Sequence, residues 1–231
     1  MIRTKSLLLA VLLVLPAVAF AQDEEHAPGV FARQLSKMDL GISASAIFNK
    51  TVSGTVDPKS NGTASNLGQS LTDDPSNTVG ALVNLRYTEK PLMGFEFNFL
   101  YSRLTENFCC SVPINGAVGS NFGVQTQANE FSIGYLVQPK IDFFTLQPYA
   151  SVGVGTTEFK PTAGGGLGEP KQARMTYYYS AGLQKDIMAN FGLRVGFRQT
   201  FLMAPDYGQN YLSIYQHTNV IEPNFGFYVK F

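Results

Sequence analysis

The closing stretch of the chain, Thr218–Phe231, alternates between apolar side chains and polar or small ones. The apolar positions are Ile221, Pro223, Phe225, Phe227, Val229 and Phe231, with Glu222, Asn224, Gly226, Tyr228 and Lys230 between them. A period of two residues is typical of a strand whose faces meet different media. At roughly ten residues, the run can cross a hydrocarbon core as a tilted strand. The alternative is an edge strand of a soluble β-sandwich.

The first residues have the pattern of a secretory signal peptide. Arg3 and Lys5 precede the apolar run Leu7–Leu15, and Ala19-Phe20-Ala21 supplies the small residues of a cleavage site. The predicted organisation is a signal peptide over residues 1–21, a periplasmic N-terminal segment over 22–37 and a β-barrel domain over 38–231. In the segment, Val30–Ser36 favours one short helical turn.

The composition limits the classes of partner and fold. Hydrophobic residues make up 45% of the chain, charged residues 15%, and the formal net charge is zero. Such a chain is too apolar for disorder, and it lacks the basic stripe that nucleic-acid binding requires. After the signal peptide no apolar run is long enough for a spanning helix, so a membrane location requires a closed barrel.

Alternation recurs along the chain and predicts eight strands. In the third, Phe95, Phe97, Phe99 and Tyr101 share one face and Glu96 lies on the other. The predicted strands cover Asp39–Asn49, Val79–Thr88, Leu92–Arg103, Gln125–Val137, Phe144–Glu158, Gln172–Gln184, Phe191–Met203 and Thr218–Phe231.

The connections alternate between long and short, as expected for a barrel with both termini in the periplasm and long external loops. The long segments are Thr51–Asn77, Leu104–Val124, Lys160–Lys171 and Ala204–His217, and the first is rich enough in Gly, Ser, Asn and Thr to be read as a mobile loop. Loops on a rigid barrel commonly carry recognition, although they can also only shield the rim.

The charges decide which face is inside. An eight-stranded lipocalin has apolar residues inside, whereas here the charged residues share a face with Gly and Ser and the opposite face is Phe, Tyr, Leu and Val. We therefore predict an all-β fold, an eight-stranded antiparallel up-and-down transmembrane β-barrel. The predicted polar network of the lumen consists of Arg86, Glu96, Glu130, Arg194, Arg198, Glu222 and Lys230.

The stretches Pro148–Gly155, Ala181–Val195 and Phe225–Phe231 resemble the small eight-stranded outer-membrane barrels of the OmpA transmembrane-domain and OmpW type. The resemblance runs from Asp39 to the end of the chain and concerns the fold. It implies a location in the outer membrane of a Gram-negative bacterium. It also implies that Phe231 is part of an assembly signal read by the barrel assembly machinery, and that lipid and lipopolysaccharide surround the barrel.

Unpaired charges in a low-dielectric interior are costly, so the inward charges should pair. We hypothesise that Glu96 and Glu130 pair with Arg194 or Arg198. Because the lumen of an eight-stranded barrel is about filled by side chains, the network predicts a closed lumen and a structural or surface-contact role through the loops. The alternative is a narrow channel or conduit for small or apolar solutes, which an apolar patch in the upper lumen would favour.

The other reactive residues predict no cofactor, metal or enzymatic site. Cys109 and Cys110 are expected in an external loop, where a strained vicinal disulfide, an intermolecular bridge and free thiols all remain open. No cluster of acids or histidines accompanies them. His217 lies near Ser213 and Asp206 in sequence, but a catalytic triad is defined by geometry. An extracellular partner of the loops is possible and unidentified.

Overall fold

The computed structural model describes residues 29–56, 68–110, 121–141 and 145–231. The predicted signal peptide lies outside these residues. The predicted periplasmic segment contains helix α2 (Val30–Leu35), at the position where the sequence favours a helical turn. No helix within the described ranges combines the length and hydropathy needed to span a membrane.

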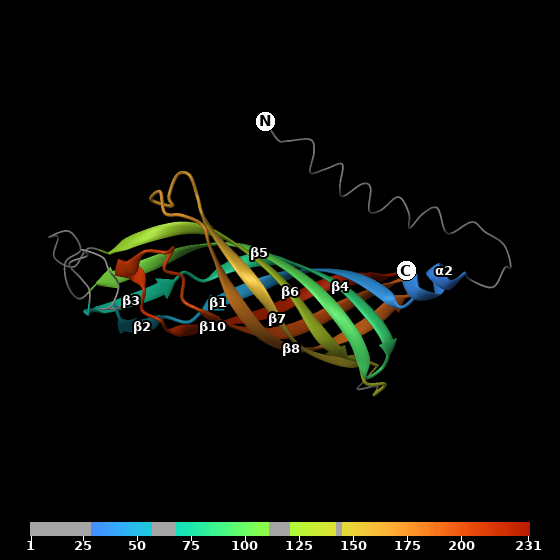
Figure 1. Ribbon diagram of the computed structural model, residues 1–231. Coiled ribbons are helices and arrows are strands. Elements are labelled where there is room, and N and C mark those ends of the chain that lie inside the picture. Colours follow the sequence, from blue (N-terminus) through green and yellow to red (C-terminus); the bar gives the residue numbers. More distant parts are fainter. Residues whose placement is uncertain (1–28, 57–67, 111–120, 142–144) are drawn as a thin grey trace.

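Eight antiparallel strands close into a barrel (Figure 1). The strands are β1 (Met38–Asn49), β4 (Thr78–Lys90), β5 (Met93–Cys110), β6 (Phe122–Val137), β7 (Gln147–Pro161), β8 (Gln172–Met188), β9 (Phe191–Met203) and β10 (His217–Lys230). Each pairs with its neighbours in sequence, and β1 pairs with β10 to close the ring. The predicted fold class is confirmed.

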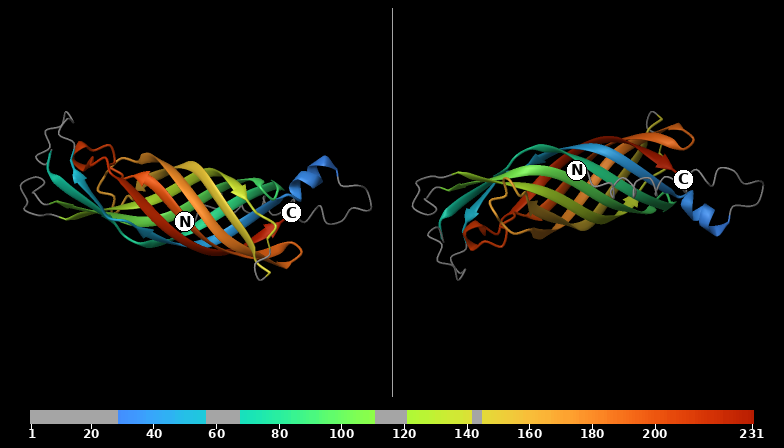
Figure 2. Two further views of the ribbon diagram at one scale, coloured as in Figure 1. Left: turned by 90° about the horizontal axis from the view of Figure 1, so that it is seen from below. Right: turned by 90° about the horizontal axis from the view of Figure 1, so that it is seen from above.

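The outer and inner faces of the barrel follow the predicted alternation. In β10 every second side chain from Ile221 is exposed, and the residues between are buried up to Tyr228. Exposed aromatic and aliphatic side chains such as Phe97, Ile133 and Val195 continue around the wall formed by the strands in Figure 2. This apolar belt suits contact with lipid.

The segment Thr51–Asn77 is not a simple loop, and that prediction is wrong for its two ends. They form a hairpin arm of β2 (Val52–Thr55) and β3 (Ser70–Pro75), which pair with each other. β3 also pairs with the end of β5, from Leu71 opposite Cys110 to Pro75 opposite Glu106. Its Gly, Ser and Thr content is typical of a loop, but pairing with β5 satisfies its backbone and buries Leu71.

The segment Leu104–Val124 is also more ordered than predicted. β5 continues to Cys110 and β6 begins at Phe122, so both strands extend past the apolar belt. Their outward residues here are polar, for example Arg103, Thr105 and Asn107, while Leu104, Glu106 and Phe108 are buried. The apolar positions change sides because the outer face meets water above the membrane, which is why the sequence pattern ended the strand at Arg103.

The opposite end of the barrel holds α2 and the C-terminus (Figure 1). The Phe231 backbone N–H donates to the Met38 carbonyl at 3.3 Å and continues the β1–β10 seam. Lys37 and Glu89 form an ion pair of 2.6 Å beside α2. The arrangement is compatible with an assembly role for Phe231, which stays a prediction.

Candidate functional site: the barrel lumen

The middle of the lumen is filled by three clusters of ion pairs. In the first, Arg198 of β9 donates to both Glu130 of β6 and Glu222 of β10, with Nη1 at 2.9 Å from Glu222 Oε2. The three side chains are at most 5% exposed. Because β6 and β9 are not neighbours in the sheet, the cluster joins opposite walls. The predicted pairing of Glu130 with Arg198 is confirmed.

The second cluster corrects the predicted partner of Glu96. Its carboxylate pairs with Arg86 at 2.9 Å, rather than with Arg194 or Arg198. The reason is the strand register, since Arg86 and Glu96 are directly opposite in the β4–β5 pair. Glu96 also accepts hydrogen bonds from Asn98, Ser151 and Tyr178, so the buried carboxylate has several donors.

The third cluster contains an acid that the sequence did not single out. Arg194 pairs with Asp39 of β1 at 2.9 Å and also donates to Asn84 and Gln184. Asp39 occupies an inward position of the alternation and could have been found by that criterion. Lys230 lies at the periplasmic rim instead of deep in the lumen, where it pairs with Asp186 at 2.6 Å and is partly exposed.

Tyrosine rings cover the three guanidinium groups. Arg86 lies 4.2 Å from the Tyr149 ring centre, Arg198 lies 4.2 Å from that of Tyr178, and Arg194 lies 4.5 Å from that of Tyr228. A cation over an aromatic face is favourable, especially where it has lost water. The charges and rings together fill the lumen and close it across this level.

Inward glycines make room for these rings. A Cβ at Gly134 would lie 2.1 Å from the Tyr178 hydroxyl oxygen, and one at Gly153 would lie 2.5 Å from the Tyr178 ring. Gly134 of β6 and Gly153 of β7 therefore leave the space that Tyr178 of β8 occupies. The alternation places Tyr178 on the inner face together with these glycines, so their contact could have been predicted from the sequence.

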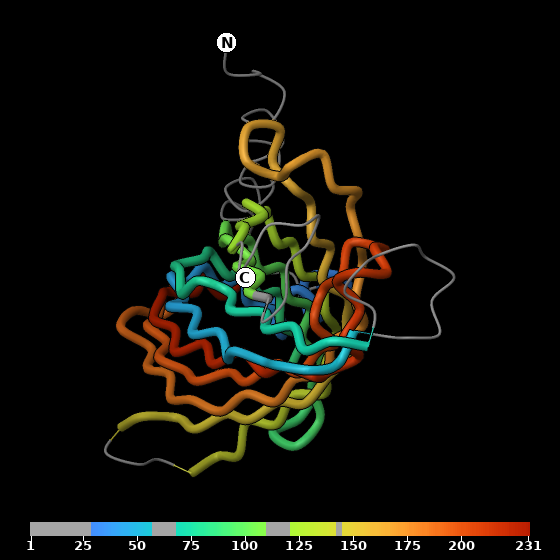
Figure 3. The backbone as a smooth tube through the Cα atoms, turned by 90° about the vertical axis from the view of Figure 1, so that its left-hand side faces the viewer, coloured from blue at the N-terminus to red at the C-terminus, as the bar shows by residue number. Residues whose placement is uncertain are grey.

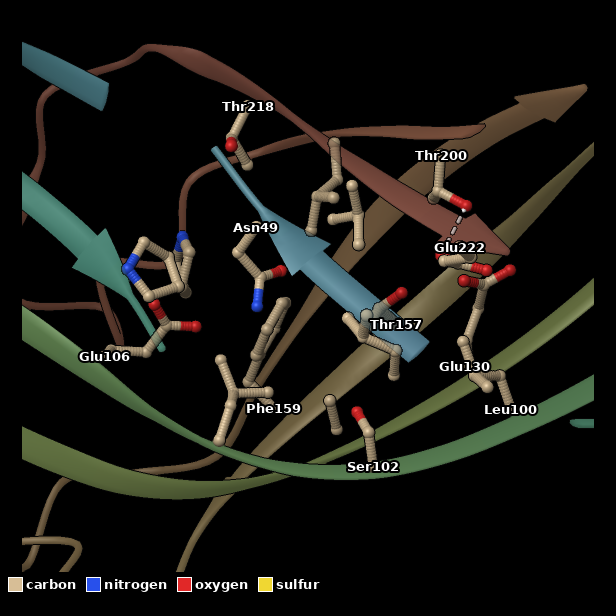
Figure 4. Close-up of a pocket in the computed structure, with 17 residues that line it drawn as sticks. Asn49, Leu100, Ser102, Glu106, Glu130, Thr157, Phe159, Thr200, Thr218 and Glu222 are labelled. Carbon is tan, nitrogen blue, oxygen red and sulfur yellow. Dashed lines mark hydrogen bonds between the residues drawn. The ribbon is translucent and has the colours of Figure 1, made fainter. Parts of the chain in front are cut away.

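A small chamber with mainly apolar walls lies above the ion pairs, on the side of the hairpin arm (Figure 4). Its volume is about 50 Å³, and roughly 10–15 Å³ of such space holds one water molecule. Glu130 and Glu222 stand at one end and Glu106 at the other. The walls include Ile47, Leu100, Leu104, Ala128, Phe159, Leu202 and Val220.

The segment 204–216 forms a plug in the mouth of the barrel beside the hairpin arm. It contains the 3-10 helix η2 (Asn210–Leu212) and buries Tyr207, Leu212 and Ile214 among side chains of the surrounding strands. Figure 3 looks into the mouth from this side. The predicted loop does lie between β9 and β10. Its apolar side chains, however, turn inward and cover the chamber.

A polar contact holds the plug to the barrel wall. Asp206 pairs with Arg174 of β8 at 2.8 Å and accepts a hydrogen bond from Ser213 at 2.7 Å. Burial raises the pKa of the Asp206 carboxyl, but hydrogen bonds from Gln172 and Ser213 and the nearby charge of Arg174 outweigh it and lower the pKa. Asp206 therefore stays ionised and paired at neutral pH.

The barrel wall beside the chamber has a break in its backbone ladder. The β1–β4 register ends at Ile47 opposite Thr78, and the β2–β3 register begins at Val52 opposite Asp73. Between them, Asn49 donates its backbone N–H to Asn77 Oδ1 at 2.9 Å and its side-chain amide to the Ser76 carbonyl at 2.8 Å. Side chains thus replace backbone pairing at this level.

The remaining candidate residues form no catalytic group among the described residues. Ser213 bonds to Asp206, while His217 is exposed and has no hydrogen bond to a described serine or acid. Within the same ranges, no three His, Cys, Asp or Glu residues gather as metal ligands. Cys109 is an exposed free thiol at the end of β5, and the side chain of Cys110 lies outside the description. The pair thus belongs to a strand rather than a loop.

No protein-family model matches the chain, and no curated protein matches it. Solved structures do. Neisserial surface protein A is 13% identical, with a TM-score of 0.52, over 84% of this chain and 97% of that protein. The outer membrane protein OprG from Pseudomonas aeruginosa is 11% identical, with a TM-score of 0.52, over 84% of this chain and 95% of that protein.

These similarities show a shared fold, that of the small eight-stranded outer-membrane β-barrels. The apolar belt and the charged interior of the chain agree with it independently. The protein is therefore a barrel of the outer membrane.

Proposed function

We propose that this barrel takes up small apolar molecules through its extracellular half, and that its lumen is closed toward the periplasm. The observation that carries the proposal is the chamber of apolar side chains enclosed above the ion pairs. Ligand sites are usually concave and mostly apolar, with a few polar groups that fix orientation. A barrel with only a structural role needs no such space in its lumen.

The closed lower lumen argues against passage straight through the barrel. A solute leaving the chamber downward would have to separate Arg198 from Glu130 and Glu222, which leaves charges buried without partners. The break in the ladder beside Asn49 offers less resistance, because side-chain hydrogen bonds can open without the loss of backbone pairing. The lipid-facing residues Phe48 and Val79 adjoin the break, so an apolar solute would enter the membrane there.

A surface-contact role is the second candidate. It is favoured by the hairpin arm, which extends the wall past the apolar belt and pairs with β5. Lipopolysaccharide, the assembly machinery and an extracellular protein are proposed partners under either function. The two functions differ in what they require of the chamber, since surface contact does not use it.

The test fills the chamber. Ala128 lines it, and Ala128→Phe would occupy its space, whereas Ala181→Phe adds the same ring on the exposed lipid face of β8. Liposomes with lipopolysaccharide in the outer leaflet should take up n-pentane faster with the wild-type protein than without it. Ala128→Phe should abolish the gain and Ala181→Phe should keep it. Equal uptake by the two variants would contradict the proposal and favour surface contact.

A further inference from the structure

The lining of the chamber contains acidic side chains but no basic ones. Three carboxyl groups, those of Glu106, Glu130 and Glu222, line it, and its lining includes no Lys, Arg or His. Glu130 and Glu222 are already bonded to Arg198, which lies below them. Glu106 is different, because no basic side chain of the described residues pairs with it. The chamber therefore has one satisfied acidic end and one unsatisfied acidic end.

Glu106 belongs to a buried carboxyl pair. Its side chain and that of Asp73 on β3 are each 1% exposed. Both oxygens of Asp73 and Oε2 of Glu106 have no donor among the described residues. Burial, and after it the neighbouring charge of Asp73, raise the pKa of Glu106, so the two carboxyl groups hold a proton between them. An unpaired buried charge is costly, so the pair holds protons as long as nothing positive replaces them.

The groups around the pair offer no such positive charge. Asp74, the next residue on β3, is an acid and interacts with Asp73. Tyr207 of the plug interacts with both carboxyl groups of the pair, and its hydroxyl is hydrogen-bonded to Thr126 of β6. The charge of Glu169 has a smaller effect on the pKa of Tyr207 than those of Glu106 and Asp73. Burial raises the pKa of Asp73 to about 7 and the pKa of Glu106 well above its usual range. Both residues lie beyond the lipid belt, at the level where outward side chains are polar.

We propose that the chamber binds a small primary ammonium compound with a short apolar body, whose ammonium group occupies the Glu106 end beside Asp73. The apolar walls cover the body, and the two carboxyl groups supply charge and acceptors that have no partner in the protein. An ammonium ion donates three hydrogen bonds and replaces the shared proton. The assignment rests on the proposed function, since it names the substrate class of the same chamber.

Charge and volume decide between ligand classes. A carboxylate of the same size would face three acids and is excluded by repulsion. A neutral alcohol fits the walls but forms only neutral hydrogen bonds, and charge-assisted bonds are about twice as strong. We therefore expect n-propylammonium to bind roughly 10-fold more tightly than 1-propanol. A factor of this size corresponds to the difference in strength between hydrogen bonds of charged and of neutral groups.

The experiment is an NMR titration of the isotope-labelled full-length protein in lipid nanodiscs, with n-propylammonium and 1-propanol as probes. At pH 8 the ammonium probe should bind roughly 10-fold more tightly than the alcohol. Lowering the pH to 6 should weaken the ammonium probe about 10-fold, because acid restores the shared proton, and should leave the alcohol unchanged.

Acid-to-amide substitutions in the chamber and on the surface distinguish binding in the chamber from binding elsewhere on the protein. The double variant Asp73→Asn/Glu106→Gln keeps the shape and removes both carboxyl groups of the pair, so it should abolish both the preference for ammonium and its pH dependence while the alcohol still binds. Glu158→Gln is the matched control, because Glu158 is a carboxylate of β7 paired with the exposed Lys171, and it should behave as the wild type.

The outcomes distinguish this inference from the proposed function. If the alcohol binds the wild type as tightly as the ammonium probe, or if the preference survives in Asp73→Asn/Glu106→Gln, the ammonium assignment is wrong and the apolar chamber stands. If neither probe perturbs the chamber residues of the wild type, the proposed function fails together with the assignment.

Discussion

Each arginine in the lumen lies between carboxylates or amides and a tyrosine ring, and its neighbours explain why a buried charge is tolerated there. Arg198 is the clearest case, since it is 3% exposed in its side chain and holds Glu130 and Glu222 together. Arg198 is the one cation that pairs with these two carboxylates. The stability of the cluster is therefore concentrated in a single residue.

Replacing that residue should be strongly destabilising. We expect Arg198→Met to lower the free energy of unfolding by roughly 3–5 kcal/mol, because it leaves two buried carboxyl groups without their partner. The measurement is urea unfolding of the refolded protein, followed by circular dichroism. Lys171→Met is the control, because the exposed pair of Lys171 with Glu158 should contribute at most about 1 kcal/mol. A similar loss in both variants would contradict this account of the cluster.

The sequence predicted the position of these residues better than their partners. Alternation placed Arg86, Glu96, Glu130, Arg194, Arg198 and Glu222 inside, and the structure confirms it. It did not give the partner of Glu96, because Arg86 becomes its neighbour only through the β4–β5 register. Nor did it identify Asp39, which lies at the very start of a strand where the alternation had only begun.

Among the elements, the plug 204–216 determines whether the chamber is open. Its contact with the wall depends on the pair formed by Asp206 and Arg174, which is only partly buried. The plug is also held by the packing of Tyr207, Leu212 and Ile214 against the upper strands, and by hydrogen bonds to Thr126, Gln172 and Glu169. The plug can therefore loosen while the barrel below it stays intact.

Arg174→Gln should loosen the plug selectively. Without the arginine charge, Asp206 keeps its hydrogen bonds but loses its ion pair, so amide hydrogen exchange should speed up severalfold in residues 204–216. Exchange in β9 and β10 at the level of the ion pairs should not change. Lys160→Gln, at an exposed position of β7, serves as the control and should have no effect on the plug. Uniform acceleration over the whole barrel would show that the plug is not an independent unit.

The hairpin arm and the plug are the elements that sequence reasoning missed. Both were predicted as loops, the first from its Gly, Ser, Asn and Thr content and the second because it connects two predicted strands. β3 becomes a strand because the end of β5 offers an unpaired edge to it. The plug buries its apolar side chains because the open mouth of the barrel leaves Leu202 and Phe159 uncovered.

For the whole molecule, the arrangement is a barrel closed at mid-height with a small apolar chamber above. The ion pairs fill the lower lumen, and the pair of Arg198 with Glu130 joins strands that are not neighbours in the sheet. A closed core of this kind is expected for eight strands, whose interior is just wide enough for side chains to fill. The lumen should therefore not conduct ions.

Single-channel recording in a planar bilayer tests this expectation. The wild-type protein should show no steady conductance, because three separate clusters close the same level. Glu96→Ala should remain silent as well, since Arg198 and Arg194 keep their own partners when the Arg86 cluster is disturbed. Steady wild-type conductance that changes in Glu96→Ala would show that the lumen is the working path, and the closed-lumen account would be wrong.

The sequence by itself determined the eight strands of the barrel and their two faces. These follow from alternation, which is a local property that each strand carries along its own length. The tertiary structure decided which charges pair, where the lumen is open and what covers its mouth. Such contacts depend on the stagger of strands around the closed ring, which brings Glu130 to Arg198 and Asp39 to Arg194 across many residues of chain.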